Sequence, residues 1–307
     1  MQAGDVLRLW SEDAFGGGVL QRTTDRPTEL LDTRYLNPQT GPFYVEGAEP
    51  GDTLVLHIVD LTPPARDWAA STTIPFFGGL TGTDRTRTLQ QPLPELTWIY
   101  QIDRARNVAL FEARRPVAGR EPFSVELPME PMLGTVGVAP PRCGSPDLPD
   151  PPDNFGGNMD TPEMRAGATV YLPVNVPGAL FSIGDGHYRQ GEGESCGTAI
   201  EGAMDSTLIV ELIKGACSGL ASDGERRVHH DRRFLAPTGG RMANRAGGDG
   251  RLAQRATRTR PARRYQLLTQ ISLTPIANVV DVNYSAVTKV RKSLLPEPPP
   301  TVPSTAT

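Results

Sequence analysis

The stretch TLVLHIVDL, residues 53–61, follows a Pro-Gly-Asp turn and is apolar at most of its positions. Leu54, Leu56 and Ile58 alternate along it, and several of their neighbours are apolar as well. Because alternate residues of a strand share a face, this pattern predicts a strand that is buried on both faces or lies beneath a second sheet.

Shorter runs of the same kind predict further strands on either side of this stretch. They cover residues 4–10, 96–102, 108–113, 124–129, 168–176, 179–185 and 206–215, and residues 285–295 form a last strand or helix. Gly 32 and Pro 30 make up about a fifth of the 307 residues, so long helices are few. The sequence therefore predicts a turn-rich, mainly β (α+β) fold with few helices.

Composition excludes several classes of protein. The net charge of −4 is too small to indicate a nucleic-acid or acidic-membrane partner. No run reaches the roughly 18 apolar residues of a transmembrane helix, and the N-terminus lacks the apolar core of a signal peptide. Three cysteines, far apart and without a CxxC pair, argue against a disulfide framework and against a zinc site made of cysteines. We expect a soluble, cytoplasmic protein.

Two segments lack a strand pattern. Residues 139–153 are rich in proline and are predicted to form a long loop. Residues 226–264 carry 12 of the 31 basic residues, all of them arginine, without an apolar period. This segment is a solvated basic loop, a phosphate- or RNA-binding arm, or a stretch translated out of frame. Shifting its reading frame by one base can yield Ile-Thr-Thr-Gly and an amphipathic helix fragment, which favours the third interpretation.

Four polar islands interrupt the strands and are candidates for chemistry. They contain Glu12 and Asp13; Asn37, Glu46 and Asp52; Asn154, Asn158 and Asp160; and Asp185, His187, Glu192, Glu194, Cys196 and Glu201. Each also has a purely structural interpretation. The segment around Asp52 is typical of a hairpin turn, Asp160 can cap a helix beginning at Thr161, and Cys196 can be a small buried apolar residue.

Asp185 and His187 form the strongest candidate site. They are two residues apart in a glycine-flanked segment, so an extended backbone places both side chains on one side. A carboxylate and an imidazole presented together suit zinc or another divalent ion, or a histidine base oriented by a carboxylate.

The order of the motifs resembles the acetamidase/formamidase family. The resemblance is carried by NPQTGPFYVEGAEPGDTL (37–54), GTVGVAPP (134–141), FGGNMD (155–160), GATVYLPVNVPGALFSIGDGHYRQGEGESCGTAIE (167–201) and LLTQISLTPIANVVD (267–281). The 35-residue central block is long and specific. The resemblance covers residues of about 4–225 and 265–295.

This resemblance implies a cytoplasmic, homo-oligomeric amidohydrolase with a β-sandwich-containing fold, which splits short linear amides into carboxylate and ammonia. It also implies a divalent metal, with zinc as the expected ion, near the GGNMD and GDGH motifs. We expect residues 1–287 to form a single catalytic domain, with residues 226–264 irregular, and residues 288–307 to form a C-terminal segment whose proline-rich tail is disordered.

The chain departs from the family pattern at a few positions. Glu192 stands where the family pattern has an aspartate, a change of one methylene that can weaken catalysis. Ala14 stands where many members carry cysteine, and a strand that precedes the chain's start in the family is expected to be missing.

The predicted mechanism is metal-assisted hydrolysis. Asp160, Asp185 and His187 are the expected metal ligands, and the ion activates water and polarises the amide carbonyl. The other predicted roles are proton transfer by Glu194 or Glu201 and donation to the developing oxyanion by Asn158.

Two alternatives remain open from sequence. In one, Cys196 is a nucleophile that works with a carboxylate base. In the other, the chain is an inactive member of the family that at most binds a small ligand. Metal removal and an assay for ammonia release separate these alternatives.

Overall fold

The computed structural model describes residues 1–79, 93–113, 123–141, 155–215, 222–224, 228–235, 270–273, 275–280, 284–291 and 294. For residues 222–224, 228–235, 284, 286 and 288 it describes the backbone alone. The predictions for the proline-rich loop at 142–153, for the arginine-rich residues 236–264 and for the C-terminal tail lie outside the described residues. So do Cys143, Asn154 and Cys217.

Strands dominate the described chain, and α1 (Pro27–Leu30) is a single helical turn. One sheet contains β1 (Val6–Ser11), β3 (Thr53–Thr62), β10 (Thr169–Pro173), β13 (Met204–Ile213), β14 (Ser222–Gly224), β15 (Val228–Leu235), β16 (Ser272–Leu273), β17 (Ile276–Asn278) and β18 (Tyr284–Arg291). The other contains β2 (Gln39–Phe43), β4 (Trp68–Thr73), β5 (Leu96–Asp103), β6 (Val108–Glu112), β7 (Ser124–Pro128), β8 (Met132–Gly137), β9 (Gly156–Asn158), β11 (Phe181–Arg189) and β12 (Ile200–Glu201).

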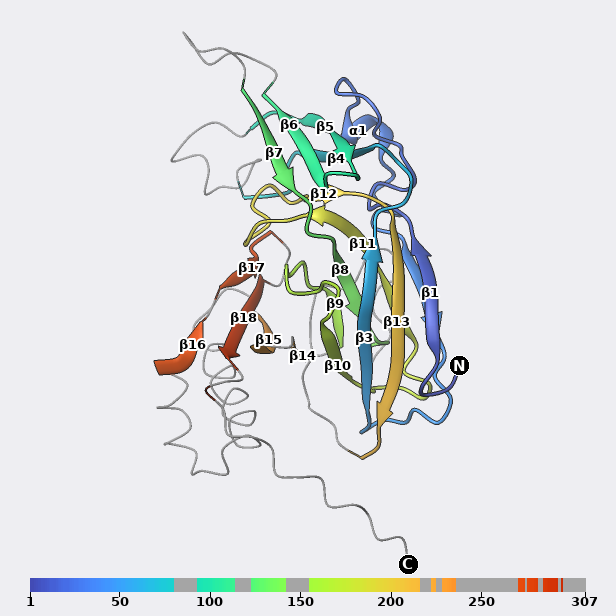
Figure 1. The fold of residues 1–307 in the computed structure, drawn as a ribbon. Helices are drawn as coiled ribbons and strands as arrows, with labels where there is room; N and C mark the ends of the chain where they lie inside the picture. Colours follow the sequence, from blue (N-terminus) through green and yellow to red (C-terminus); the bar gives the residue numbers. More distant parts are fainter. Residues whose placement is uncertain are drawn as a thin grey trace, which may run out of the picture.

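The strands run antiparallel to their neighbours in both sheets (Figure 1). The first sheet has the order β1-β13-β3-β10-β14-β15-β18-β16, with β17 on β18. The second has the order β7-β6-β5-β4-β12-β11-β8-β9, with β2 on β11. The prediction of a mainly β fold with few helices is confirmed.

Strand β3 lies inside the first sheet, between β13 and β10. Its residues Leu54, Val55, Leu56 and Ile58 are all buried, although they point alternately to the two faces. The expectation of a strand buried on both faces is therefore correct for the first half of β3. Its second half opens to solvent, where Val59 is exposed.

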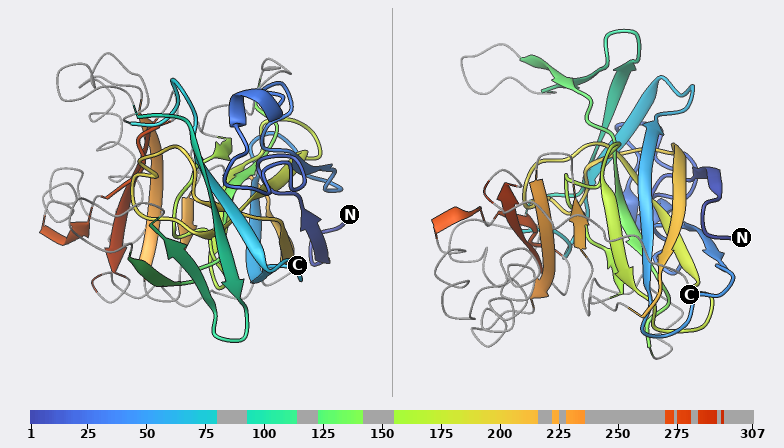
Figure 2. Two further views of the ribbon diagram at one scale, coloured as in Figure 1. Left: turned by 90° about the horizontal axis from the view of Figure 1, so that it is seen from above. Right: turned by 60° about the horizontal axis from the view of Figure 1, so that its bottom comes forward.

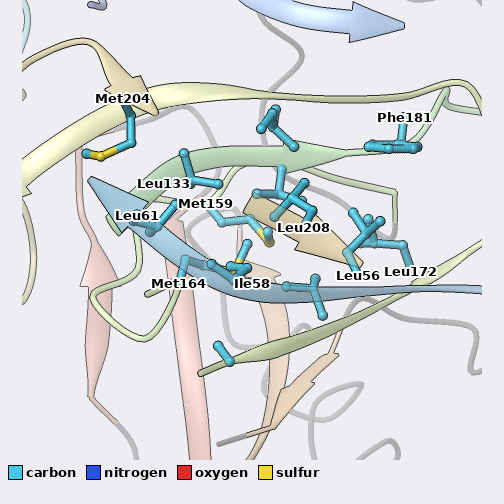
Figure 3. Close-up of a cluster of buried hydrophobic side chains, with 14 of the residues drawn as sticks. Leu56, Ile58, Leu61, Leu133, Met159, Met164, Leu172, Phe181, Met204 and Leu208 are labelled. Carbon is cyan, nitrogen blue, oxygen red and sulfur yellow. The ribbon is translucent and has the colours of Figure 1, made fainter. Parts of the chain in front are cut away.

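The two sheets pack on each other through one hydrophobic core (Figure 3). Leu56, Ile58 and Leu208 contribute from the first sheet, and Leu133 and Phe181 from the second. Burial of such side chains contributes about 1.5–3 kcal/mol each. Strands β8 and β11 line this core. The polar residues in the segments that connect and follow these two strands are therefore anchored to a rigid part of the fold.

Strands β5, β6 and β7 extend away from this packed region as an arm (Figure 2). Every residue of β7 except Leu127 is exposed. No helix among the described residues has the length and apolar character that a membrane-spanning helix needs.

Several local predictions need correction. Residues 228–235 form strand β15, so the expectation of an irregular segment is wrong there. The side-chain pattern of this segment does not indicate a strand, and its regular backbone comes with pairing to β14 and β18. Residues 161–164 form a turn closed by Met164 N–H to Thr161 O, not a helix capped by Asp160. The last apolar segment is a strand, β18. Strands β4 and β8 are absent from the predicted set because their Ala, Ser, Thr and Gly residues do not resemble an apolar run.

Candidate active site

Strand β11 presents Asp185 and His187 to the same side, as predicted from their spacing. The Nε2 atom of His187 lies 3.2 Å from Oδ1 of Asp185. Strand β12 pairs with β11 so that Glu201 stands directly opposite His187, and its Oε2 lies 3.2 Å from the same Nε2. All three side chains are at least 95% buried. The imidazole is therefore held between two buried carboxylates.

Asp160 reaches the same place from the turn that follows β9. Its backbone N–H donates to the carbonyl of Gly134 at 3.0 Å, which fixes the turn on β8. A Cβ at Gly134 would overlap Oδ2 of Asp185 and would lie 2.6 Å from Oδ1 of Asp160. Strand β8 thus passes under the two carboxylates at a position where any side chain would displace at least one of them.

Glu194 completes the group from the turn after β11. We call Asp160, Asp185, His187, Glu194 and Glu201 the acidic cluster. Ligand atoms of Asp160, Asp185 and His187 lie within 4.8 Å of one another, and so do those of His187, Glu194 and Glu201. His187 belongs to both groups, and all five side chains are buried. Five residues predicted from sequence to act together therefore meet in space.

The two carboxylates beside His187 have different electrostatic environments. Desolvation raises the pKa of Glu201 above its ordinary value, and this effect exceeds the opposing attraction of His187. Desolvation acts on Asp185 too, but the charge and hydrogen bond of His187, together with side-chain hydrogen bonding to Asp160 and Asn37, lower the pKa of Asp185. Burial lowers the pKa of His187, yet the charges of Glu201 and Asp185 raise it well above its usual range.

Four amide and hydroxyl side chains surround the cluster. Nδ2 of Asn158 donates to Oδ2 of Asp160 at 2.6 Å, and Oδ1 of Asn158 accepts from Thr135 at 2.5 Å and from Asn37 at 2.8 Å. Nδ2 of Asn278, from β17, also donates to Oδ2 of Asp160 at 2.6 Å. Asn158 is thus in contact with the cluster, and its oxyanion role stays a prediction.

Sequence reasoning missed Asn278 and Gln190, although both are buried at the cluster. Asn278 lies in IANVVD, which looks like a plain strand, and the signal was a polar side chain in the middle of the apolar run IANVV. Gln190 follows the Asp185–His187 pair by three residues in the chain, and no pattern separates it from a polar turn residue.

The other predicted residues lie apart from these contacts. The thiol of Cys196 is partly exposed and donates to the carbonyl of Thr198 at 3.1 Å, within its own turn. Glu192 is half exposed and pairs with Lys289 at 3.2 Å. Asp13 is buried and binds Arg66 at 2.7 Å. Asp52 accepts from the N–H of Glu49, as the hairpin-turn interpretation expects.

The fold and the site define a class: a mainly β protein of two packed antiparallel sheets with a buried carboxylate–imidazole cluster between its strands. Comparison with known proteins gives the family. The sequence profile of the acetamidase/formamidase family matches residues 1–144 and 148–232. The chain belongs to this family.

Individual relatives agree with this assignment. The chain is 28% identical over 250 residues to a formamidase of Methylophilus methylotrophus (70% of this chain, 61% of the relative) and 30% identical over 263 residues to an acetamidase of Mycolicibacterium smegmatis (70% and 63%). The chain thus spans about six tenths of the length of these relatives. The crystal structure of an acetamidase from Yersinia enterocolitica superposes with a TM-score of 0.83 at 32% identity, covering 97% of this chain and 86% of that one.

Proposed function

We propose that this chain hydrolyses the C–N bond of short linear amides, of the formamide and acetamide type, to a carboxylate and ammonia. Membership of an amidase family supports the reaction class. The observation that carries the proposal is the imidazole of His187 between Asp185 and Glu201, with Asp160 and Glu194 beside it. Buried titratable groups with diverging pKa values are typical of catalytic sites.

The donor set fits a divalent cation, for which we propose zinc. Four carboxylates and one imidazole supply the oxygen and nitrogen ligands that zinc takes, and their burial excludes most of the competing water. Oε2 of Glu201 is buried, and its one close polar neighbour in the described structure is Nε2 of His187 at 3.2 Å. Asp160, Asp185 and His187 would hold the ion. A bound divalent cation supplies Lewis acidity, which polarises an amide carbonyl and lowers the pKa of water.

The chain's own residues perform the remaining steps. Glu201, whose pKa is raised by burial, accepts a proton from the attacking water and returns it to the leaving nitrogen, because an amine leaves poorly unless it is protonated. Glu194 is the second candidate for this transfer. Asn158 donates to the oxygen on which negative charge develops.

We further propose that the protein works as a homo-oligomer and that residues 1–287 form one catalytic domain. The domain proposal is supported by Asn278 and Asp160, which meet at 2.6 Å although they are 118 residues apart in the chain. Light scattering of the purified protein tests the oligomer, for which a mass above that of one 33.1 kDa chain is expected.

The reaction is tested by measuring ammonia release from formamide and acetamide, together with the metal content of the purified protein. Asp185→Asn is expected to lose the metal, and Glu201→Gln is expected to keep it while turnover falls about 10²–10⁴-fold. Glu112→Gln, an exposed carboxylate on β6, is the matched control.

Three outcomes would contradict this proposal in different ways. Activity that survives complete metal removal but disappears in Cys196→Ser would identify the cysteine as the nucleophile. Metal binding without turnover of any amide would identify a ligand-binding protein. Equal loss of activity in Glu112→Gln and Glu201→Gln would show that the assay reports folding alone.

A further inference from the structure

Gln190 makes three contacts that determine how its side chain is oriented. The residue follows β11 and is 7% exposed. Its Nε2 lies 2.6 Å from the backbone carbonyl oxygen of Asp160 and 3.4 Å from that of Ala277. Its Oε1 lies 2.8 Å from Nδ1 of His187.

Only one orientation of the side-chain amide of Gln190 is consistent with these partners. A carbonyl oxygen can only accept a hydrogen bond, so the end of Gln190 that faces two carbonyl oxygens is the NH2 group. The end that faces His187 is therefore the amide oxygen, which can only accept. It follows that Nδ1 of His187 carries a proton and donates it to Gln190.

The other ring nitrogen then faces the acidic cluster. Nε2 lies 3.2 Å from Asp185 and 3.2 Å from Glu201, on the side of the ring opposite Gln190. We propose that Gln190 is a positioning residue, which fixes the ring and the Nδ1-protonated form of His187 so that Nε2 is the atom offered to a divalent cation. This inference rests on the metal site of the proposed function. A hydrogen bond to the distal nitrogen of a ligating histidine typically changes metal affinity 10–100-fold.

The same amide connects parts of the chain that are far apart in sequence. Asp160 belongs to the turn after β9 and is itself a member of the cluster, whereas Ala277 belongs to β17. The N–H of Gly193 also donates to the carbonyl of Ala277, at 2.8 Å, and the N–H of Val279 donates back to Gly193 at 3.1 Å. Strand β17 and the residue after it thus hold the turn that follows Gln190, and Gln190 in turn orients His187.

The test compares Gln190→Met with Gln190→Glu in the full chain. Methionine preserves the length of the side chain but accepts no useful hydrogen bond from Nδ1. A glutamic acid can still accept from Nδ1, and in its protonated form it donates to a carbonyl oxygen. Gln21→Met is the matched control, because its amide donates to the carbonyl of Gly18 at 2.7 Å and has no described contact with the cluster.

Two measurements are made on each variant: zinc affinity by competition with a chelator, and nitrogen-15 spectra of the histidine rings in zinc-free and zinc-loaded protein. We expect Gln190→Met to bind zinc 10–100-fold more weakly and to lose the protected Nδ1–H signal of His187. Gln190→Glu is expected to recover most of the affinity and the signal. Gln21→Met is expected to match the wild type in both.

Other results would overturn the inference. Wild-type affinity in a folded Gln190→Met variant, or equal losses in the methionine and glutamate variants, would show that Gln190 has no orienting role or only a packing role. If the wild type itself binds no zinc, the proposed metal site fails, but the zinc-free spectra still decide the orientation. A protected Nδ1–H of His187 that disappears in Gln190→Met would support the role of Gln190 in orienting the ring. An Nδ1 without a proton in the wild type would refute that role.

Discussion

Backbone strain is concentrated at the residues of the candidate site. Of the eight non-glycine residues with positive φ in the described chain, four are Asn37, Asp160, Asp185 and Glu194, all at the acidic cluster. A left-handed conformation at a non-glycine residue costs about 1–3 kcal/mol, although Asn and Asp tolerate it best. The packing of the surrounding strands must offset this cost. The strained backbone in turn gives the side chains of the site their positions.

Gly134 provides the sharpest test at the residue scale. A methyl group there would overlap the carboxylates of Asp185 and Asp160, so Gly134→Ala must push at least one of them out of place. We expect zinc affinity and amide hydrolysis to fall at least 10-fold, with a loss of stability of about 1–3 kcal/mol. Titration with zinc and the urea midpoint measure the two effects.

Gly191→Ala is the control for this substitution, since a Cβ at Gly191 meets no atom within 4 Å. If both variants bind zinc as the wild type does, Asp160 and Asp185 do not hold the ion.

Sequence reasoning named all five residues of the acidic cluster, including Asp160, which belongs to a separate motif. Asp185 and His187 were predictable because a strand places alternate residues on one face. The opposition of Glu201 to His187 depends on the register between β11 and β12, which a bulge at His187–Arg189 shifts. Asn278 was not predictable, because nothing in IANVVD indicates which distant turn it meets.

At the scale of elements, runs rich in apolar residues predicted strands such as β3 and β13, and strands rich in small residues were missed. Strand β8 is buried along five of its six residues, yet it contains two glycines. Those glycines are required by what surrounds them: Gly134 lies under the cluster, and at Gly137 a Cβ would lie 2.8 Å from the backbone of Gly157. The features that make β8 suitable for the site also obscure it in the sequence.

The turn before β3 depends on the charge of Asp52. Desolvation raises the pKa of this carboxyl, but hydrogen bonds from Lys214, from the N–H of Gly215 and from the N–H of Glu49 together lower it below its ordinary value. A group whose pKa is lowered by folding stabilises the protein above its unfolded pKa, and this contribution disappears as pH falls through the folded value. The end of β13 is therefore held to the start of β3 at neutral pH and released in acid.

We expect Asp52→Asn to lower stability by about 1.5–3 kcal/mol at pH 7, since a hydrogen bond to a charged group is worth that much. The difference from the wild type should begin to shrink below about pH 4, where the unfolded chain takes up the proton, and should disappear as the pH falls through the lower pKa of the folded state. Urea midpoints at pH 7 and pH 3 measure this. Asp60→Asn, on the exposed part of β3, is the control. If Asp52→Asn differs from the wild type by the same amount at both pH values, the charge of Asp52 does not stabilise the turn.

At the scale of the whole molecule, one core supports both sheets and the site together. Leu133 is completely buried, contributes to the core from β8, and is the neighbour of Gly134. Its N–H donates to the carbonyl of Met164 at 2.9 Å, so its backbone also holds the turn that follows Asp160. The hydrophobic core and the acidic cluster therefore both rest on β8, through the neighbouring residues Leu133 and Gly134.

This arrangement predicts that a core cavity weakens the site. Leu133→Ala is expected to cost about 2–5 kcal/mol of stability, because the space left by a buried leucine is only partly refilled. Val6→Ala, at an edge-strand position that is 61% exposed, is the control and should change stability by less than about 0.5 kcal/mol. Because β8 passes beneath Asp160 and Asp185, zinc affinity should fall in Leu133→Ala and stay unchanged in Val6→Ala. A Leu133→Ala protein that loses stability but binds zinc with full affinity would show that the strain at the cluster is maintained locally, by the turns and amides around it, and not by the core.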